Sequence, residues 1–165
     1  MSLIQLQKYF TAFGDVFQEE AGIGIGYTRK SVEVTGTEGE VLQIGRFIGM
    51  ESVSAKTGTI LKTIEEIKEA KVLGIYAGND AYQNMISENP TYNHNVTEFK
   101  ADTLTQKVVV INRGQIGVAR GGNEGTSRYD SGLKFPAGTS LADKEIVWAK
   151  LEDAGFKVLR QVSVQ

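Results

Sequence analysis

The amino-acid sequence predicts a mainly β protein: a compact β-barrel or sandwich-like domain with one or two short helices and an N-terminal arm. Composition is the first observation, because glycine accounts for 19 of the 165 residues and proline for only two. The second is that short β-branched runs recur between these glycines, as in β proteins with many turns. The third is length, which suits one domain with its own core. We therefore expect an arm or helix over residues 1–20 and a single β-rich domain over residues 21–165.

Residues 1–20 differ in character from the rest of the chain. Their apolar side chains recur at spacings of three and four, which fits an amphipathic helix that Gly14 interrupts. Three interpretations remain open: a helix packed on the protein's own core, an arm docked on a neighbouring subunit, and an extended strand. The apolar positions include Phe13 and Phe17. The candidate protein-interaction residues of a docked arm are Leu3, Ile4, Leu6, Tyr9 and Phe10.

A glycine cluster follows, in which Gly22, Gly24 and Gly26 alternate with other residues. A dinucleotide-binding loop requires the spacing G-x-G-x-x-G between a strand and a helix, because the helix N-terminus must face the pyrophosphate. The spacing here is G-x-G-x-G, and the strand-like residues 31–36 follow it. We therefore expect no cofactor, and we interpret the cluster as a strand or loop that another backbone approaches closely.

A strand and a short helix are predicted next. Residues 40–48 have the composition of a strand. Thr63 and Glu66 match the capping-box signature, in which the threonine oxygen and the glutamate carboxylate each accept a hydrogen bond from a free backbone N–H. A short helix is therefore expected to begin near Thr63. Its apolar face comprises Ile60, Ile64 and Ile67.

The strongest strand signals lie in the middle of the chain. Residues 72–77 form an apolar run, and residues 107–112 are rich in valine and isoleucine, which favour the pleated surface. Residues 115–120 are again strand-like after a short Arg113-Gly114 corner. This pattern predicts a β-hairpin, with Gly114 at a positive φ.

Two segments are predicted to be loops. Residues 78–105 form a long polar excursion, which we interpret as a surface loop that contacts a neighbouring subunit. Residues 121–127 are rich in glycine but lack the lysine and serine or threonine that end a phosphate-binding loop, so a flexible surface loop is expected. Residues 146–149 and 156–164 are predicted to be the closing strands, with Trp148 as a core or interface anchor.

Charge and composition argue against several classes of function. The formal net charge is −2, whereas nucleic-acid binders usually carry a basic excess. The apolar runs are much shorter than the ~20 residues of a membrane helix, and the N-terminus lacks the features of a signal peptide, so we expect a protein made in the cytoplasm with no membrane partner. The chain has no cysteine and a single histidine, His94, and it contains no G-x-S-x-G motif. We therefore expect that the protein is not an enzyme and that it has no catalytic, cofactor-binding or metal-binding residue.

Five segments carry a family resemblance, in order along the chain. They are Phe13-Gly14-Asp15-Val16, Ile44-Gly45-Arg46-Phe47, Lys71-Val72-Leu73-Gly74-Ile75, the run from Val108 to Val118, and Trp148 with Ala154-Gly155-Phe156-Lys157-Val158-Leu159. Together they resemble the head cement (decoration) proteins of tailed bacteriophages. The chain departs from this family after residue 120, where Gly121 to Arg128 replace an alanine-glycine-aspartate turn.

The resemblance implies a virion structural protein that binds the outer surface of a phage capsid and stabilises it by bridging capsomers. It implies two partners, the major capsid protein and further copies of the chain as a dimer or trimer, and no cofactor. A net charge near zero limits repulsion between many copies on one shell, and repetition gives avidity. One alternative is another head-fibre or tail component. Another is a β-rich oligomeric nucleotide hydrolase, in which Arg128-Tyr129-Asp130 would lie at a subunit seam.

Overall fold

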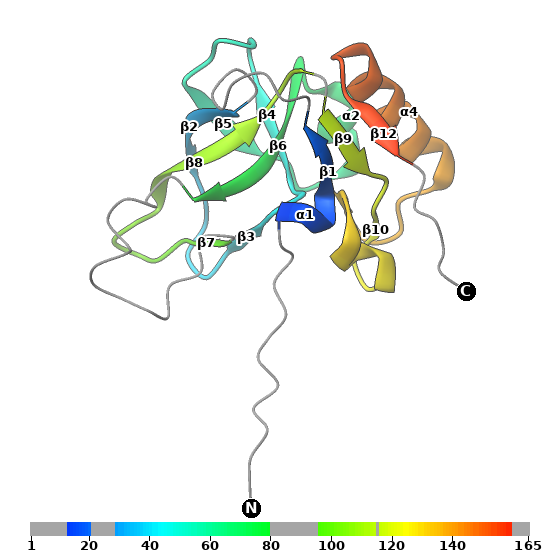
Figure 1. The fold of residues 1–165 in the computed structure, drawn as a ribbon. Coiled ribbons are helices and arrows are strands. Elements are labelled where there is room, and N and C mark those ends of the chain that lie inside the picture. Colours follow the sequence, from blue (N-terminus) through cyan, green and yellow to red (C-terminus); the bar gives the residue numbers. More distant parts are fainter. Residues whose placement is uncertain (1–12, 21–28, 80–95, 115, 160–165) are drawn as a thin grey trace, which may run out of the picture.

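The computed structural model describes residues 13–20, 29–79, 96–114 and 116–159, and these residues fold around a closed β-barrel. The barrel strands follow the order β2, β5, β4, β6 and β8, and β8 pairs back with β2 to close the ring (Figure 1). Only the β2–β5 pair is parallel within the barrel. The prediction of a mainly β protein with a compact barrel is confirmed. The barrel strands are β2 (Arg29–Thr35), β4 (Phe47–Met50), β5 (Thr57–Ile60), β6 (Val72–Asn79) and β8 (Thr105–Ile111).

The barrel interior is a close-packed apolar core. In β2, Val32 and Val34 point inward and are 1% exposed, whereas Glu33 between them is exposed, as the two-residue period of a strand requires. Glycine allows the strands to approach: a Cβ on Gly74 would lie 2.3 Å from the Cγ1 atom of Val110. The predicted strands over residues 31–36 and 72–77 are confirmed as β2 and β6.

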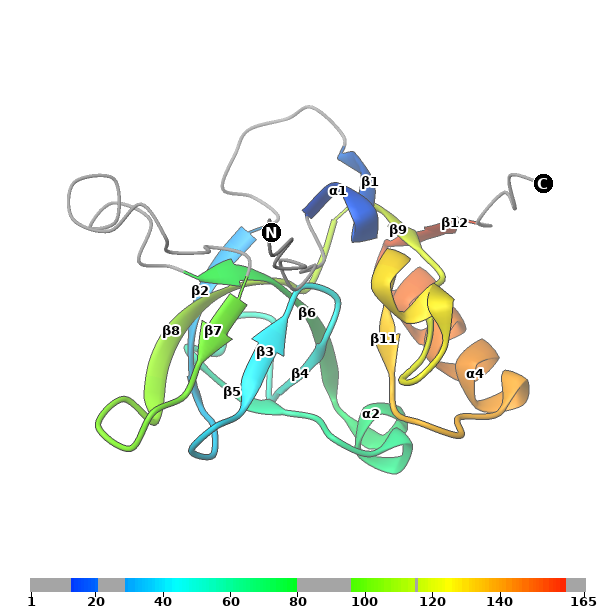
Figure 2. The same ribbon diagram turned by 90° about the horizontal axis from the view of Figure 1, so that it is seen from below.

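A second layer lies beside the barrel (Figures 1 and 2). Its sheet has β9 in the centre, with β1 antiparallel on one side and β12 parallel on the other. A short parallel pair, β10 with β11, and a 3₁₀ turn, η1, complete this layer together with α4. Its elements are α1 (Phe13–Val16), β1 (Phe17–Glu20), β9 (Ile116–Ala119), β10 (Gly122–Asn123), η1 (Ser127–Ser131), β11 (Lys134–Phe135), α4 (Leu141–Asp153) and β12 (Lys157–Leu159).

Aromatic side chains join the two layers into one core. Phe47 of the barrel packs on Phe135 of β11, with ring centroids 5.3 Å apart, and Phe135 meets Trp148 of α4 edge-on at 6.2 Å. Such pairs contribute roughly 0.5–1.5 kcal/mol beyond their buried area. The layers are also linked at the surface, where the ammonium group of Lys68 lies 2.7 Å from the carboxylate of Asp143. The prediction that Trp148 is a core or interface anchor is confirmed for the core, in which its side chain is buried.

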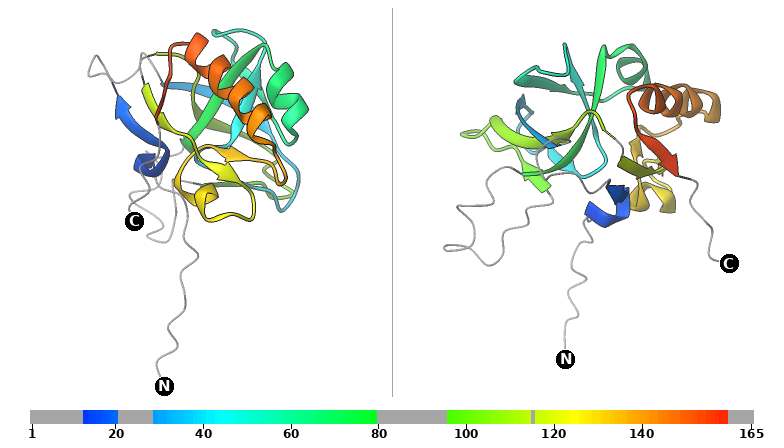
Figure 3. Two further views of the ribbon diagram at one scale, coloured as in Figure 1. Left: turned by 90° about the vertical axis from the view of Figure 1, so that its right-hand side faces the viewer. Right: turned by 45° about the horizontal axis from the view of Figure 1, so that its top comes forward.

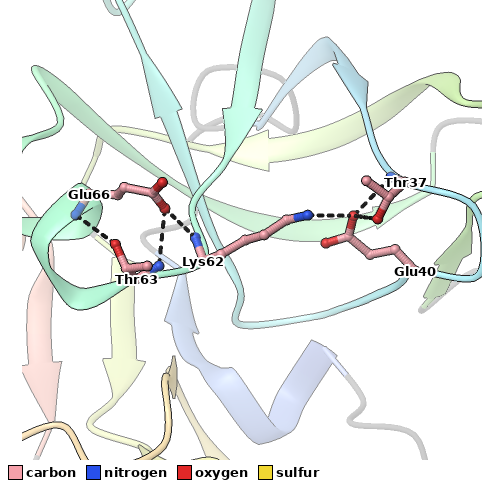
Figure 4. A network of polar contacts seen from close by, with 5 residues as sticks. All are labelled: Thr37, Glu40, Lys62, Thr63 and Glu66. Atoms are coloured by element: carbon pink, nitrogen blue, oxygen red, sulfur yellow. Dashed lines mark hydrogen bonds and ion pairs between the residues drawn. The ribbon is translucent and has the colours of Figure 1, made fainter.

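The short helix α2 (Ile64–Glu69) begins with the predicted capping box (Figure 4). Glu66 N donates to Thr63 Oγ1 at 3.3 Å, and the Glu66 carboxylate accepts from the backbone N–H groups of Thr63 and Lys62 at 3.0 and 2.8 Å. These two backbone donors lower the pKa of the Glu66 carboxyl, and the N–H of Lys62 has the larger effect. The Lys62 ammonium group also lies 3.2 Å from the carboxylate of Glu40, which connects the start of α2 to the chain before β3.

The strand predicted over residues 40–48 is wrong as a single element. It is divided into β3 (Val41–Gln43) and β4, and Gly45 between them has φ = +98°, which breaks the extended conformation. β3 leaves the barrel and pairs with β7 (Val96–Glu98). A buried hydrogen bond of 2.8 Å between Tyr76 Oη and Thr97 Oγ1 fastens this pair to the barrel.

The predicted β-hairpin is also wrong, although both of its strands exist. β8 lies between β2 and β6 in the barrel, whereas β9 lies between β1 and β12 in the second sheet. Both edges of each strand are therefore occupied by other partners. The corner at Arg113-Gly114 carries the chain from one sheet to the other. The positive φ predicted for Gly114 is confirmed at +104°.

Gly114→Val is expected to lower the free energy of unfolding by about 1–3 kcal/mol, since a β-branched residue is strained at this φ. Urea titration of the two proteins measures the difference. The matched control is Arg113→Val, which places the same side chain one residue earlier, at a position without positive φ. We expect a change within about 0.5 kcal/mol for this exposed position. Equal stability of Gly114→Val and the natural protein would contradict the prediction.

The strand predicted over residues 146–149 is wrong, because these residues lie in the helix α4. Val147, Trp148 and Leu151 form its buried face, while Ile146 is 52% exposed. The helix begins at Leu141, and the Oγ of its N-cap residue, Ser140, accepts a hydrogen bond of 3.1 Å from Asp143 N. A serine at the N-cap is a helix-start signal that offsets the β preference of the Ile146-Val147 pair.

The prediction of a flexible surface loop over residues 121–127 is wrong for its first three residues, whereas residues 124–126 form an exposed turn. Gly122 and Asn123 pair with β11, and Gly121 packs against the backbone of Leu133. Of the predicted strand over residues 156–164, Lys157–Leu159 form β12, and residues 160–164 lie outside the described residues. Most of the excursion predicted over residues 78–105 and the glycine cluster at residues 22–26 lie outside the described residues.

Candidate functional site

A pocket of about 620 Å³ opens in the second layer, where strand β9 ends and helix α4 begins. Residues of β10, η1 and the first turns of α4 line it. These elements lie on the same side of the molecule (Figure 3). This volume lies within the usual range of ligand-binding clefts. The side chains used in the argument below are Arg120, Asn123, Arg128, Leu141, Lys144 and Trp148.

Arg120 and Trp148 form the inner wall of this pocket. The Arg120 guanidinium carbon lies 4.6 Å from the centroid of the Trp148 ring, within the range of a cation–π contact. The indole Nε1 donates a hydrogen bond of 3.3 Å to the carbonyl oxygen of Arg120. These two contacts hold Arg120 and Trp148 together. On the core side, the Phe135 ring packs at nearly a right angle to the indole.

Two buried polar atoms at the pocket have no hydrogen-bond partner among the described residues: Arg120 Nε, a donor, and Asn123 Oδ1, an acceptor. The orientation of the asparagine amide follows from its other atom, because Nδ2 donates to the carbonyl oxygen of Thr139 at 2.8 Å. Buried polar atoms are nearly always paired in folded proteins, and an unpaired atom therefore indicates a place for a ligand or water. Both residues line the pocket, and a ligand reaches these two atoms once their side chains shift.

The charge of the pocket is positive. Arg120, Arg128 and Lys144 line it, and none of the described lining residues is acidic. Asp143, the acidic residue of the first turn of α4, is engaged elsewhere by Lys68 and by the Ser140 hydroxyl at 2.7 Å. Two contacts lower the pKa of the Asp143 carboxyl. The larger effect comes from the hydrogen bond with Lys68, and the smaller from the Ser140 hydroxyl. The three cations therefore face the pocket without a counter-charge on its walls.

A buried lysine lies on the other side of η1. Lys134 is 1% exposed, donates a hydrogen bond of 2.6 Å to the carbonyl oxygen of Tyr129, and lies 4.1 Å from the centroid of the Tyr129 ring. Burial lowers its pKa to about 8, while Asp130 and Asp15 oppose this shift and Arg46 adds to it. Burial likewise raises the pKa of Tyr129. This cluster fixes η1, and with it the wall of the pocket that carries Arg128.

The five predicted interaction residues, Leu3, Ile4, Leu6, Tyr9 and Phe10, lie outside the described residues, as does His94. The described chain begins at Phe13, where α1 contacts η1 and β9. Val16 and Phe17 are buried in the common core, and Phe17 belongs to β1, so the extended alternative holds for Phe17–Glu20. Residues 1–12 thus precede a segment that is anchored in the fold next to η1.

The residues of the pocket were not singled out by the sequence as a binding site. Arg120 was placed at the end of a hairpin, Asn123 in a flexible loop, and Trp148 on a strand. The triplet Arg128-Tyr129-Asp130 lies in η1, where Arg128 faces the pocket and Tyr129 packs on Lys134. One feature of the sequence could have indicated the pocket, namely the glycine-rich run between Arg120 and Arg128. The start of α4 is brought next to this run only by the tertiary structure.

The described part of the chain contains no group of three or more histidine, aspartate or glutamate side chains placed to hold a metal ion. Nor does any helix within it have the length and apolarity needed to cross a membrane. Comparison of the chain with protein-family models, with curated proteins and with solved structures found no match in any of the three.

Proposed function

We propose that the protein is a structural component of a bacteriophage head, which binds the outer surface of the capsid and stabilises it by bridging capsomers. Its partners in this proposal are the major capsid protein and further copies of itself. It works by binding and not by catalysis, and it functions on the exterior of the virion. A head-fibre or tail component remains the alternative of the same class.

The observation that carries this proposal is the position of the family-like segments in the fold. Leu73-Gly74-Ile75 and Val108 to Ile111 lie side by side in β6 and β8, and Gly74 allows the close approach of Val110. Phe47 and Trp148, from two other family-like segments, meet through Phe135. The resemblance therefore rests on residues that pack in the core of this fold.

Capsids provide the direct test. Empty capsids that lack the protein are mixed with the purified chain, sedimented, and imaged by electron microscopy. We expect the chain to sediment with the capsids, to appear as regular density on their outer surface, and to raise their melting temperature. A chain that stays in the supernatant, together with phosphate release from added nucleotides, would favour the hydrolase alternative instead.

Deletion of residues 2–10 tests the predicted arm. Several apolar side chains buried at roughly 1.5–3 kcal/mol each would supply much of the ~8 kcal/mol of a micromolar contact, less the cost of ordering the segment. We expect the truncated protein to keep its melting temperature as a monomer, because Val16 and Phe17 still anchor the fold, and to lose self-association or capsid binding. The measurements are calorimetry, analytical ultracentrifugation and capsid sedimentation.

Two results would contradict the arm hypothesis. One is an unfolded truncated chain, which would mean that residues 2–10 belong to the core. The other is a folded truncated chain that self-associates and binds capsids as well as the full chain.

A further inference from the structure

The pocket between β10, η1 and the start of α4 combines three properties that a ligand must match. It carries three cations, Arg120, Arg128 and Lys144, without an acidic residue among its described lining. It contains one buried donor and one buried acceptor without partners, Arg120 Nε and Asn123 Oδ1. It also has an apolar wall, formed by Trp148 and by Leu141, which is 63% exposed.

These properties specify the chemistry of the occupant. A group with negative charge satisfies the cations, and a carboxylate oxygen is a good acceptor for a guanidinium N–H. The acceptor Asn123 Oδ1 requires a donor that lies close to that carboxylate. The indole and the leucine require an apolar group beside both. An aspartate or glutamate residue in a peptide meets the first two conditions, because its backbone N–H lies next to its own side chain, and an apolar neighbour in the peptide meets the third.

We infer that this pocket binds an acidic segment of a partner protein, with a carboxylate held by the cations Arg120, Arg128 and Lys144. A shift of the Asn123 side chain then lets its Oδ1 accept a hydrogen bond from the backbone N–H of the segment. The inference rests on the proposed function for the identity of the partner, which is an acidic surface segment of the capsid protein. Nucleic acid is the less suitable polyanion, because the chain has a net charge of −2 and the pocket presents only three cations. Inorganic phosphate matches the charge but leaves the apolar wall without a contact.

The natural protein contains its own probe, since Trp148 is the single tryptophan of the chain and lines the pocket. Its fluorescence is followed while a capped Asp-Leu-Glu-Leu peptide is added, and isothermal calorimetry measures the same titration. We expect saturable binding with a change in the tryptophan emission. The matched peptide Asn-Leu-Gln-Leu, which has the same shape without charge, is expected to bind at least about tenfold more weakly, because hydrogen bonds to charged groups are the stronger ones.

The double variant Arg128→Gln/Lys144→Gln tests the cations of the rim. Its matched control is Lys56→Gln/Lys107→Gln, which removes two exposed lysines, one directly before β5 and one in β8. Each pair changes the net charge from −2 by −2 to −4, so a general effect of charge is equal in both. We expect the rim variant to bind the acidic peptide at least about tenfold more weakly and the control to bind within about twofold of the natural protein. The circular dichroism spectrum and the melting temperature check that both variants are folded.

Several results would overturn the inference. They are equal binding of the two peptides, an equal effect of the two double variants, and a tryptophan response to sodium phosphate or to a 12-nucleotide single strand without a response to the acidic peptide. The peptide comparison needs no variant, so the test remains decisive if a variant fails to fold.

The capsid experiment separates this inference from the proposed function. If the natural protein and the rim variant bind capsids equally, the pocket is not the capsid contact, and the proposed function stands without it. If the natural protein ignores capsids but binds the acidic peptide through the rim cations, the proposed function fails, and the pocket remains a site for acidic segments.

Discussion

Gly121→Ala is expected to lower the free energy of unfolding by at least about 3 kcal/mol, the upper end of the usual range for strain or overpacking alone. A Cβ at this position would lie 1.7 Å from the carbonyl oxygen and 2.3 Å from the amide nitrogen of Leu133. The obstacle is backbone and cannot rotate away. The residue also has φ = +69°, where side chains other than glycine are strained. Urea titration followed by circular dichroism measures the loss.

The control for this substitution is Gly125→Ala, in the same glycine-rich run. Gly125 has φ = +87°, but a Cβ there would meet nothing within 4 Å. Its substitution therefore carries the backbone strain without the collision, and about 1 kcal/mol is expected. Similar losses for the two variants would mean that the close approach of β10 to Leu133 is not a constraint of the fold.

Lys134→Met is expected to abolish a pH dependence of stability that the natural protein has between pH 7 and 9.5. In the unfolded chain this lysine keeps its proton up to a pKa near 10.5, whereas burial lowers its pKa in the folded protein to about 8. Between these values the unfolded state binds more protons, so folding becomes more favourable as the pH rises. The penalty is fully present below pH 8 and is relieved above it. Over this interval Lys134 contributes a gain of about 2 kcal/mol.

The measurement is the free energy of unfolding of both proteins at pH 7 and at pH 9.5. The quantity of interest is the difference between the two proteins, since other groups that titrate in this interval cancel in it. Lys107→Met, at an exposed position of β8, is the matched control and is expected to keep the pH dependence of the natural protein. If the difference between the natural protein and Lys134→Met is the same at both pH values, Lys134 is not held as a buried ammonium group.

Both substitutions act on the same part of the molecule, the turn that forms one wall of the pocket. Gly121 allows β10 to lie against Leu133, and Lys134 holds η1 through the carbonyl oxygen of Tyr129. The pocket is therefore built on a segment that is constrained by the fold, although its glycine content suggested a free loop. A constrained wall keeps Arg128 and Asn123 in place before a partner arrives, which lowers the cost of ordering on binding.

The sequence predicted an element correctly where the residues that determine it are neighbours in the chain. The capping box of Thr63 and Glu66 needs only four consecutive residues, and it appears as predicted. The alternation in β2 and the apolar run of β6 depend only on strand period and burial. The positive φ of Gly114 follows from a corner between two strands, whichever sheets those strands join.

The sequence by itself thus determined a mainly β domain, the class of most of its strands, the start of α2 and the anchor role of Trp148. The tertiary structure alone decided which strands pair, because β8 and β9 carry the same β-branched signal and their partners β2, β6, β1 and β12 are distant in the chain. It also decided that Ile146–Ala149 are helical, since an N-cap at Ser140 and a buried face on Phe135 outweigh local β preference. The pocket exists for the same reason. Arg120, Asn123 and Lys144 line it together only because the fold brings the start of α4 to the chain after β9, and no local pattern records such an arrangement of separate elements.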